Sequence, residues 1–181
     1  MPPSQQPILQ TKKWIQEVVI GCYFCPFAAA AVKQNNLHYT VENSSSDAIC
    51  HQAVLTELIR LDQNKEIETS FLLFTHSFDQ FDDFLIMLRK AELMLKNKNY
   101  DGIYQIASFH PAYLFNHSLE SDPANYTNRS PYPMLHFLRE KSIKAVLKDF
   151  NDIDQVPVRN IDFARTKGLA YMKLLRDNCL L

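Results

Sequence analysis

The residues best suited to chemistry gather in one segment, SFHPAYLFNHSLESDPANYTNRSPYPMLHFLRE, between Ser108 and Glu140. It holds three of the six histidines of the chain, together with arginines and several asparagines. About twenty of its residues match neither a regular strand nor a helix, and a compact domain rarely keeps such a stretch unless it forms a binding loop, a lid or a linker. Because its polar groups are too varied for a simple linker, we expect the functional site here.

An anion site is predicted where Arg129 precedes Ser130 and a proline. Serine at an N-cap followed by proline is typical of a helix start, and we expect that helix to run over 130–148. The free N–H groups of a helix start and a guanidinium beside them can bind a phosphate or carboxylate together. The alternative is a structural role, in which Arg129 pairs with Asp122 or Glu120 and fastens the loop.

His110 and His136 are candidate general bases, because imidazole titrates near neutral pH. On the expected helix 130–148, His136 and Glu140 lie one turn apart and share a face. With Cys25 they offer ligands that zinc or iron accepts, although no His-Glu-x-x-His motif or Cys-pair repeat supports a metal. The cofactor therefore stays open, with zinc and iron as candidates, and the alternative for each histidine is a structural hydrogen bond.

Cys25 is the candidate for a reactive thiol. With Cys22 it has the Cys-x-x-Cys spacing of redox motifs, and Pro26 suits the first position of a helix, which places Cys25 at the N-cap. Free backbone N–H groups and the positive end of the helix dipole lower the pKa of a thiol at that position. The alternatives are a redox dithiol, which normally follows the first strand of a βαβ unit, and two small buried side chains.

The pattern of apolar residues predicts an α/β fold. Strands are expected at 37–42, 69–75 and 103–109, and helices at 7–21, 26–32, 48–61, 80–96, 130–148 and 161–176. This alternation implies parallel neighbours joined by crossover helices, in a small, mainly parallel sheet of at least three strands with helices packed against it. Ligands of open α/β sheets gather beyond the carboxyl ends of the strands, and the segment from Ser108 begins at such an end.

Composition and charge narrow the class of protein. The 181 residues suit one domain, and we expect a disordered tail at 1–6 and a single globular domain over 7–181. A formal net charge of −1 argues against a nucleic-acid-binding protein. No apolar run approaches the roughly 18 residues that a membrane-spanning helix needs. The expected partner is therefore a small anionic molecule, with neither nucleic acid nor membrane, and the oligomeric state stays open.

The protein is expected to be cytoplasmic. Its first residues, MPPSQQPILQTKKW, lack the charged start and apolar core of a signal peptide, and its four cysteines are then expected to be reduced thiols. The chain contains three glycines, which are far apart. This excludes the Walker A loop and the three-glycine dinucleotide fingerprint, because both need glycines clustered in one turn.

A resemblance to a known family rests on three segments, VVIGCYFCPFA, ASFHPAYLF and DPANYTNRSPYPMLHFLRE. They are similar to the hallmark segments of the bacterial domain of unknown function 1415, and the resemblance covers nearly the whole chain without implying a reaction. Cys22 stands where the family usually has an aliphatic residue, which weakens the dithiol hypothesis. The resemblance implies that the following residues lie at hallmark positions: Cys25, Pro26, Phe27, His110, Pro111, Asn125, Asn128, Arg129, Ser130, Pro131, His136, Arg139 and Glu140.

The leading hypothesis is a cytoplasmic enzyme that acts on a small anionic metabolite by acid–base, thiol or metal-assisted hydrolysis or group transfer. His110 or His136 would move a proton, and Cys25 would act as a nucleophile or a metal ligand. The residues expected to bind the substrate are Arg129, Ser130, Asn125, Asn128 and Arg139, with Glu140 in support. The alternatives are a non-catalytic module that binds a small molecule or a metal, and a thiol redox protein.

Overall fold

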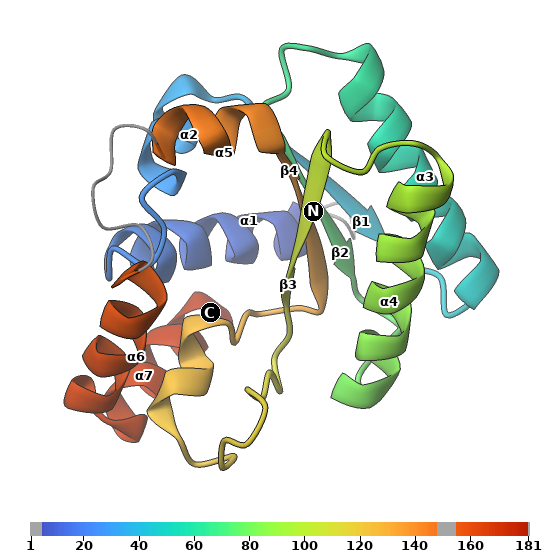
Figure 1. Ribbon diagram of the computed structural model, residues 1–181. Helices are drawn as coiled ribbons and strands as arrows, with labels where there is room; N and C mark the ends of the chain where they lie inside the picture. The colour runs from blue at the N-terminus through green and yellow to red at the C-terminus, as the bar shows by residue number, and fades with distance from the viewer. Residues whose placement is uncertain (1–4, 148–154, 181) are drawn as a thin grey trace.

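One four-stranded sheet organises the α/β fold of this protein (Figure 1). The computed structural model describes residues 5–147 and 155–180. The strands are β1 (Leu37–Glu42), β2 (Thr69–Phe74), β3 (Tyr104–Phe109) and β4 (Met134–Arg139). The α-helices are α1 (Gln5–Trp14), α2 (Ala28–Gln34), α3 (Asp47–Gln63), α4 (Phe81–Asn97), α5 (Glu140–Leu147), α6 (Val156–Lys167) and α7 (Leu169–Asp177). Shorter helical segments are η1 (Ile15–Ile20), η2 (Pro123–Thr127) and η4 (Asn178–Leu180).

The predicted elements between residues 37 and 109 are confirmed. The three predicted strands and the helices α3 and α4 form within two residues of their expected bounds. The helix predicted at 7–21 forms as α1 followed by the π-helical segment η1, and it ends at Gly21. A Cβ atom at Gly21 would lie 2.3 Å from the carbonyl oxygen of Glu17, so only glycine fits this helix end without a shift of the backbone.

The prediction of a mainly parallel sheet is wrong. β1 and β2 are parallel, but β4 lies between β2 and β3 and runs antiparallel to both. The order β1, α3, β2, α4, β3 follows the expected crossover pattern. After β3 the chain turns back through residues 110–133 and inserts β4 into the centre of the sheet. Only one of the three pairs of neighbouring strands is therefore parallel.

The error arises at 130–148, where the helix-start signal predicts a single helix. Ser130 does not cap a helix, because its hydroxyl donates to the carbonyl of Tyr132 at 2.6 Å. β4 follows instead, and α5 starts directly after it. Leu135 and Phe137 are fully buried against α3 and α4. Met134 and His136, which alternate with them along β4, lie on the opposite face of the sheet, with α1. A strand covered on both faces lacks the polar alternation that identifies a half-exposed strand.

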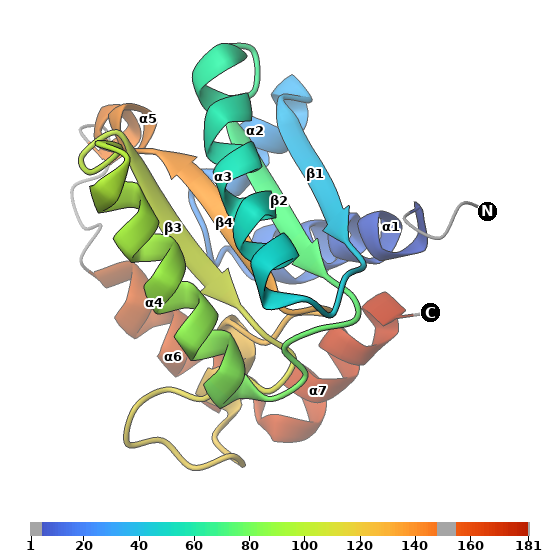
Figure 2. The same cartoon turned by 90° about the vertical axis from the view of Figure 1, so that its right-hand side faces the viewer.

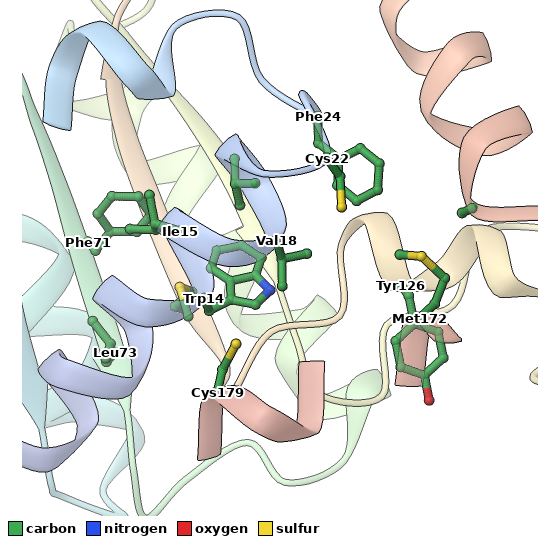
Figure 3. Packing of buried hydrophobic residues seen from close by; sticks show 13 residues of the cluster. Trp14, Ile15, Val18, Cys22, Phe24, Phe71, Leu73, Tyr126, Met172 and Cys179 are labelled. Carbon is green, nitrogen blue, oxygen red and sulfur yellow. The ribbon is translucent and has the colours of Figure 1, made fainter. Parts of the chain in front are cut away.

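Helices cover both faces of the sheet. Figure 2 shows α3 and α4 on one face, with α1 on the other. The core under α3 and α4 includes Leu58, Leu61, Leu72, Phe74, Phe84, Met87, Leu135 and Phe137. The core on the opposite face includes Trp14, Ile15, Val18, Phe71, Leu73 and Met134, and Figure 3 shows most of these side chains packed together. The two cores are separated by the sheet, so each face has its own set of contacts.

The two ends of the chain differ from expectation in detail. The helix predicted at 161–176 is divided into α6 and α7 at Gly168, whose φ of 82° and ψ of 161° are not helical. Residues 1–4 of the tail predicted at 1–6, and residue 148 of the helix predicted at 130–148, lie outside the described residues, whereas residues 5 and 6 belong to α1. None of the helices that the structure describes has the length and hydrophobicity needed to cross a membrane.

Candidate functional site

A pocket lies on the sheet face that α1 and η1 cover, next to α2 and α5. Its volume is about 200 Å³, and its lining is mostly apolar. The aromatic and aliphatic lining includes Trp14, Ile15, Val19, Phe27, Phe71 and Phe109. The polar contributors include Cys25, Thr69, His136 and Arg139. Two of the predicted catalytic residues, Cys25 and His136, therefore line the same pocket although they are far apart in the sequence.

An aromatic stack across the sheet holds the ring of His136. Tyr39, Phe71 and His136 lie opposite one another on β1, β2 and β4. Phe71 stacks on His136 with the ring centroids 3.8 Å apart and 9° between the planes, and on Tyr39 at 5.5 Å and 10°. Phe109 on β3 lies 6.3 Å from the imidazole centroid. With rings on both sides, the imidazole has little freedom to tilt.

Thr69 connects His136 to the backbone of β4. Its Oγ1 lies 2.5 Å from Nε2 of His136, and its hydroxyl donates to the carbonyl of Phe137 at 2.6 Å. Burial lowers the pKa of His136 to about 3, because an apolar environment disfavours the charged imidazolium. His136 is therefore a neutral imidazole near neutral pH, and it is half-buried at the pocket.

Cys25 lies at the pocket, but it does not cap a helix. α2 begins at Ala28 with Phe27 as its N-cap, so the prediction of Cys25 at the N-cap is wrong by two residues. Burial raises the pKa of the Cys25 thiol above the ordinary value of 9.0, whereas backbone hydrogen bonds from Phe27 and Ala28 act in the opposite direction. Because burial is the larger effect, the thiol is protonated at neutral pH, and the expected low pKa is not found.

The loop before Cys25 is fixed by α6. Tyr23 has a φ of 57°, and its carbonyl accepts a hydrogen bond from Arg159. Asn160 donates to the carbonyl of the next residue, Phe24, at 2.8 Å. Cys22 is buried in the core cluster of Figure 3, and all four cysteines, which lie within the described residues, are free thiols. The two cysteines of the Cys-x-x-Cys spacing therefore occupy different environments.

Both ring nitrogens of His110 are occupied, and His110 lies outside the pocket. Nε2 donates to the carbonyl of Phe78 at 2.8 Å, and Nδ1 accepts from the backbone N–H of Ala112 at 3.0 Å. The side chain is fully buried, and burial lowers its pKa. Phe78 has a φ of 63°, which is uncommon for a bulky residue. His110 thus joins its own loop to a strained turn before α4.

Arg129 fastens the loop after β3. Its Nε donates to the carbonyl of Tyr113 at 3.0 Å, and its Nη2 donates to the carbonyl of Glu120 at 3.2 Å. The guanidinium lies over the ring of Tyr126, 4.8 Å from the centroid. These contacts give Arg129 a structural role like the one predicted as the alternative to anion binding. The difference is that the guanidinium binds the backbone carbonyl of Glu120 and not its carboxylate.

The other predicted anion-binding residues also bond within this loop. Asn125 is buried, accepts a backbone hydrogen bond at 3.0 Å and donates another at 2.8 Å. The side-chain oxygen of Asn128 lies 3.0 Å from the hydroxyl of the preceding threonine, and the hydroxyl of Ser130 donates to the carbonyl of Tyr132. Asp122 pairs with Arg165 of α6 at 2.7 Å, and this contact holds the pKa of Asp122 at about 2.

Arg139 and Glu140 lie at the opposite end of the sheet. Arg139 lines the pocket, but its guanidinium reaches the C-terminal end of α3, where it donates to the carbonyls of Leu61 and Asn64 at 2.7 and 3.1 Å. Cations are favourable there because helix C-termini carry unpaired carbonyls and partial negative charge. Glu140 pairs with Lys144, one turn further along α5, at 2.6 Å.

The predicted metal ligands are dispersed. His136 and Cys25 line the pocket, His110 lies in the loop after β3, and Glu140 lies on α5. Within the part of the chain that the structure describes, no three His, Cys, Asp or Glu side chains form a group that could hold a metal ion.

A buried polar cluster around Glu57 was not found by sequence reasoning. The Glu57 side chain, on α3, is fully buried. Its carboxylate accepts from Thr40 of β1 at 2.8 Å and from Ser70 of β2 at 2.5 Å, and it pairs with Arg60 at 3.1 Å. The cluster ties α3 to two strands. The available signal is the place of Glu57 within the apolar stripe of α3, which is formed by Val54, Leu58 and Leu61.

Comparisons with known proteins identify the family. A family profile described as protein of unknown function (DUF1415) matches residues 6–174, which confirms the resemblance based on the three segments. No curated protein and no solved structure matches the chain. The family description names neither a reaction nor a ligand. Because the match covers most of its 181 residues, the chain belongs to this family of proteins of unknown function.

Proposed function

We propose that the protein binds a small, mainly apolar molecule in the pocket that Cys25 and His136 line. The proposal is carried by the composition of this pocket, in which a largely aromatic and aliphatic lining surrounds a few polar groups. That combination is typical of small-molecule sites. An unfilled apolar cavity costs stability, so a cavity that also gathers a thiol, a hydroxyl and an imidazole is better explained by a ligand than by imperfect packing.

The volume of the pocket limits the size of the ligand. An apolar cavity of about 150 Å³ accommodates benzene, so a volume of about 200 Å³ suits a single-ring compound or a short chain of similar size. The rings of Trp14, Phe27 and Phe109 line the pocket and offer edges and faces to an aromatic ligand.

Anion binding by Arg129 and Ser130 stays a prediction with less support. The guanidinium of Arg129 already donates to two carbonyls, and the hydroxyl of Ser130 donates to a third. Arg139 lines the pocket, but its guanidinium is engaged at the end of α3. A neutral ligand therefore fits these groups better than a phosphate. We keep the proposal of a cytoplasmic protein, which agrees with its four free thiols.

Catalysis at the same pocket is the second candidate function. It is favoured by the presence of a thiol and an imidazole in one pocket, since Cys25 would serve as a nucleophile and His136 as the acceptor of its proton. Burial disfavours catalysis by this pair in the ligand-free protein, because it raises the pKa of the Cys25 thiol and lowers the pKa of His136. Transfer of the thiol proton to the imidazole is therefore unfavourable, and ligand binding is the leading proposal.

The proposal is tested with variants that fill the pocket. Ala31 on α2 lines the pocket, whereas Ala29 on the same helix does not. We expect phenol to raise the Tm of the wild-type protein and of Ala29→Leu, because a ligand that binds the folded state stabilises it by mass action. The Tm of Ala31→Leu should not respond, because the added side chain occupies the space of the ligand.

Sodium benzoate in the same series tests an anionic ligand of similar size. A response of Ala31→Leu equal to that of Ala29→Leu, or no response of the wild-type protein to single-ring probes, would contradict the proposal. A response to benzoate alone that disappears in Arg129→Ala would favour the anion site in the loop instead.

A further inference from the structure

Two short contacts fix the proton positions around Thr69. The hydroxyl of Thr69 carries one proton, and the carbonyl of Phe137 can only accept. The 2.6 Å contact between these groups therefore uses the Thr69 proton. At the 2.5 Å contact with His136, the oxygen of Thr69 must then accept. Nε2 of His136 consequently carries a hydrogen and donates it.

The other nitrogen of His136, Nδ1, is left with a lone pair. A neutral imidazole carries a single N–H, and His136 is neutral because burial lowers its pKa to about 3. Within residues 5–147 and 155–180, the hydrogen bond of the His136 ring is the one at Nε2. Nδ1 is also not one of the polar atoms that are sealed from solvent without a partner. His136 lines the pocket, so the pocket is the open space next to this side chain.

We infer that Nδ1 of His136 is a hydrogen-bond acceptor for the ligand of the pocket, and that the pocket selects small apolar molecules that carry an O–H or N–H donor. The inference rests on the proposed function, because it names the chemistry of the ligand at that same site. The stack on Phe71 fixes the plane of the imidazole, so the donor must approach within that plane. Phenols and single-ring N–H heterocycles meet this requirement.

Selectivity arises because a ligand without a donor leaves Nδ1 unpaired in an apolar pocket. Phenol and toluene have nearly the same shape, but only phenol can donate. Toluene is the more apolar molecule, so absolute affinities mix two effects, and the informative quantity is the ratio of the toluene Kd to the phenol Kd. The free energy of one hydrogen bond corresponds to a change of about three- to tenfold in this ratio of Kd values.

The experiment compares both probes in the wild-type protein and in His136→Phe by calorimetry. His136→Phe keeps an aromatic ring against Phe71 and removes the acceptor. We expect the ratio of the Kd values to fall by about three- to tenfold in the variant. An equal ratio in the two proteins overturns the inference while leaving the proposed function intact. If neither probe binds, the proposed function fails, and the inference about its ligand fails with it.

A second measurement does not depend on a folded variant. Long-range proton–nitrogen correlation spectra of the wild-type protein distinguish a protonated from an unprotonated ring nitrogen. We expect His136 to show a protonated Nε2 and an unprotonated Nδ1, and we expect phenol, but not toluene, to shift the Nδ1 signal. A protonated Nδ1 in the ligand-free protein overturns the inference.

Discussion

The imidazole of His136 lies flat against the ring of Phe71, with the ring centroids 3.8 Å apart and 9° between the planes. The two residues are direct partners on the neighbouring strands β4 and β2, so the sheet itself sets their register. Thr69, two residues before Phe71 on β2, contacts the edge of the same imidazole. One strand therefore fixes both the plane and the protonated nitrogen of His136, which prepares this side chain for a single role at the pocket.

The burial of His136 predicts a specific dependence of stability on pH. Its pKa is about 3 in the folded protein against an ordinary value of 6.5, so the unfolded chain binds a proton between these values that the folded protein does not. The free energy of unfolding should therefore fall as the pH drops from 6.5 towards 3 and should not change on this account above 6.5. The slope from this residue is at most about 1.4 kcal/mol per pH unit.

Urea unfolding of the wild-type protein and of His136→Phe across this pH range measures the effect. The variant should lose less stability than the wild type as the pH falls. His117→Asn, which removes an exposed imidazole, should follow the wild type. Parallel curves for the wild type and His136→Phe would show that His136 is not buried in neutral form.

The raised pKa of Cys25 predicts slow alkylation at neutral pH. Only the thiolate reacts, so the rate of modification by iodoacetamide should rise about tenfold per pH unit between about pH 7 and 9 without reaching a plateau. Peptide mass spectrometry assigns the modified residue, and Cys25→Ser is the control, since the other three cysteines are buried. A plateau below about pH 8 would reveal an activated thiol and would favour the catalytic alternative.

His110 should matter for stability and not for binding at the pocket. His110→Ala removes two hydrogen bonds from a fully buried side chain and leaves a backbone carbonyl and an N–H unpaired. We expect a loss of about 2–4 kcal/mol in the free energy of unfolding. The Kd for phenol, measured where the variant is folded, should stay within about twofold because the two sites share no partner. A large rise in this Kd at unchanged stability would return His110 to the functional site.

Glu57 should be among the most sensitive positions of the fold. Its buried carboxylate accepts from Thr40 and Ser70 and pairs with Arg60. Glu57→Gln places an amide N–H₂ among these donors and leaves Arg60 without its partner, so we expect a loss of about 3 kcal/mol or more. Glu92→Gln, an exposed position on α4, should change stability by less than about 0.5 kcal/mol. Similar small effects of both changes in urea unfolding would refute the importance of this cluster.

The fold could be predicted where the burial pattern of an element is regular. The continuous apolar run of β2 and the amphipathic stripe of α4 each identify their element from the sequence. β4 could not be predicted in this way, because MLHFL fits a buried helix face as well as a strand buried on both sides. Whether this segment forms a helix or a strand is decided by the space between β2 and β3, which exists only in the assembled sheet. Pro131 and Ser130 add a helix-start signal that the chain uses for a turn.

The sequence predicts which types of residue belong to the site, but it does not predict how these residues are arranged in space. Cys25 and His136 were identified as chemically suited residues, but their presence in one pocket depends on the insertion of β4. Arg129 and His110 bond to backbone carbonyls, and every residue has a carbonyl, so these partners leave no signal in the sequence. A charged residue within an apolar helix stripe, as at Glu57, is a signal that could have been used.

Binding at the pocket is tested most directly by mapping amide chemical shifts during a titration with phenol. We expect the shifted amides to surround the pocket, on α2 near Ala31, on β2 from Thr69 to Phe71 and on β4 at His136, and we expect Ala31→Leu to abolish these shifts. Shifts confined to the loop around Arg129, or none at saturating phenol, would contradict binding at the pocket.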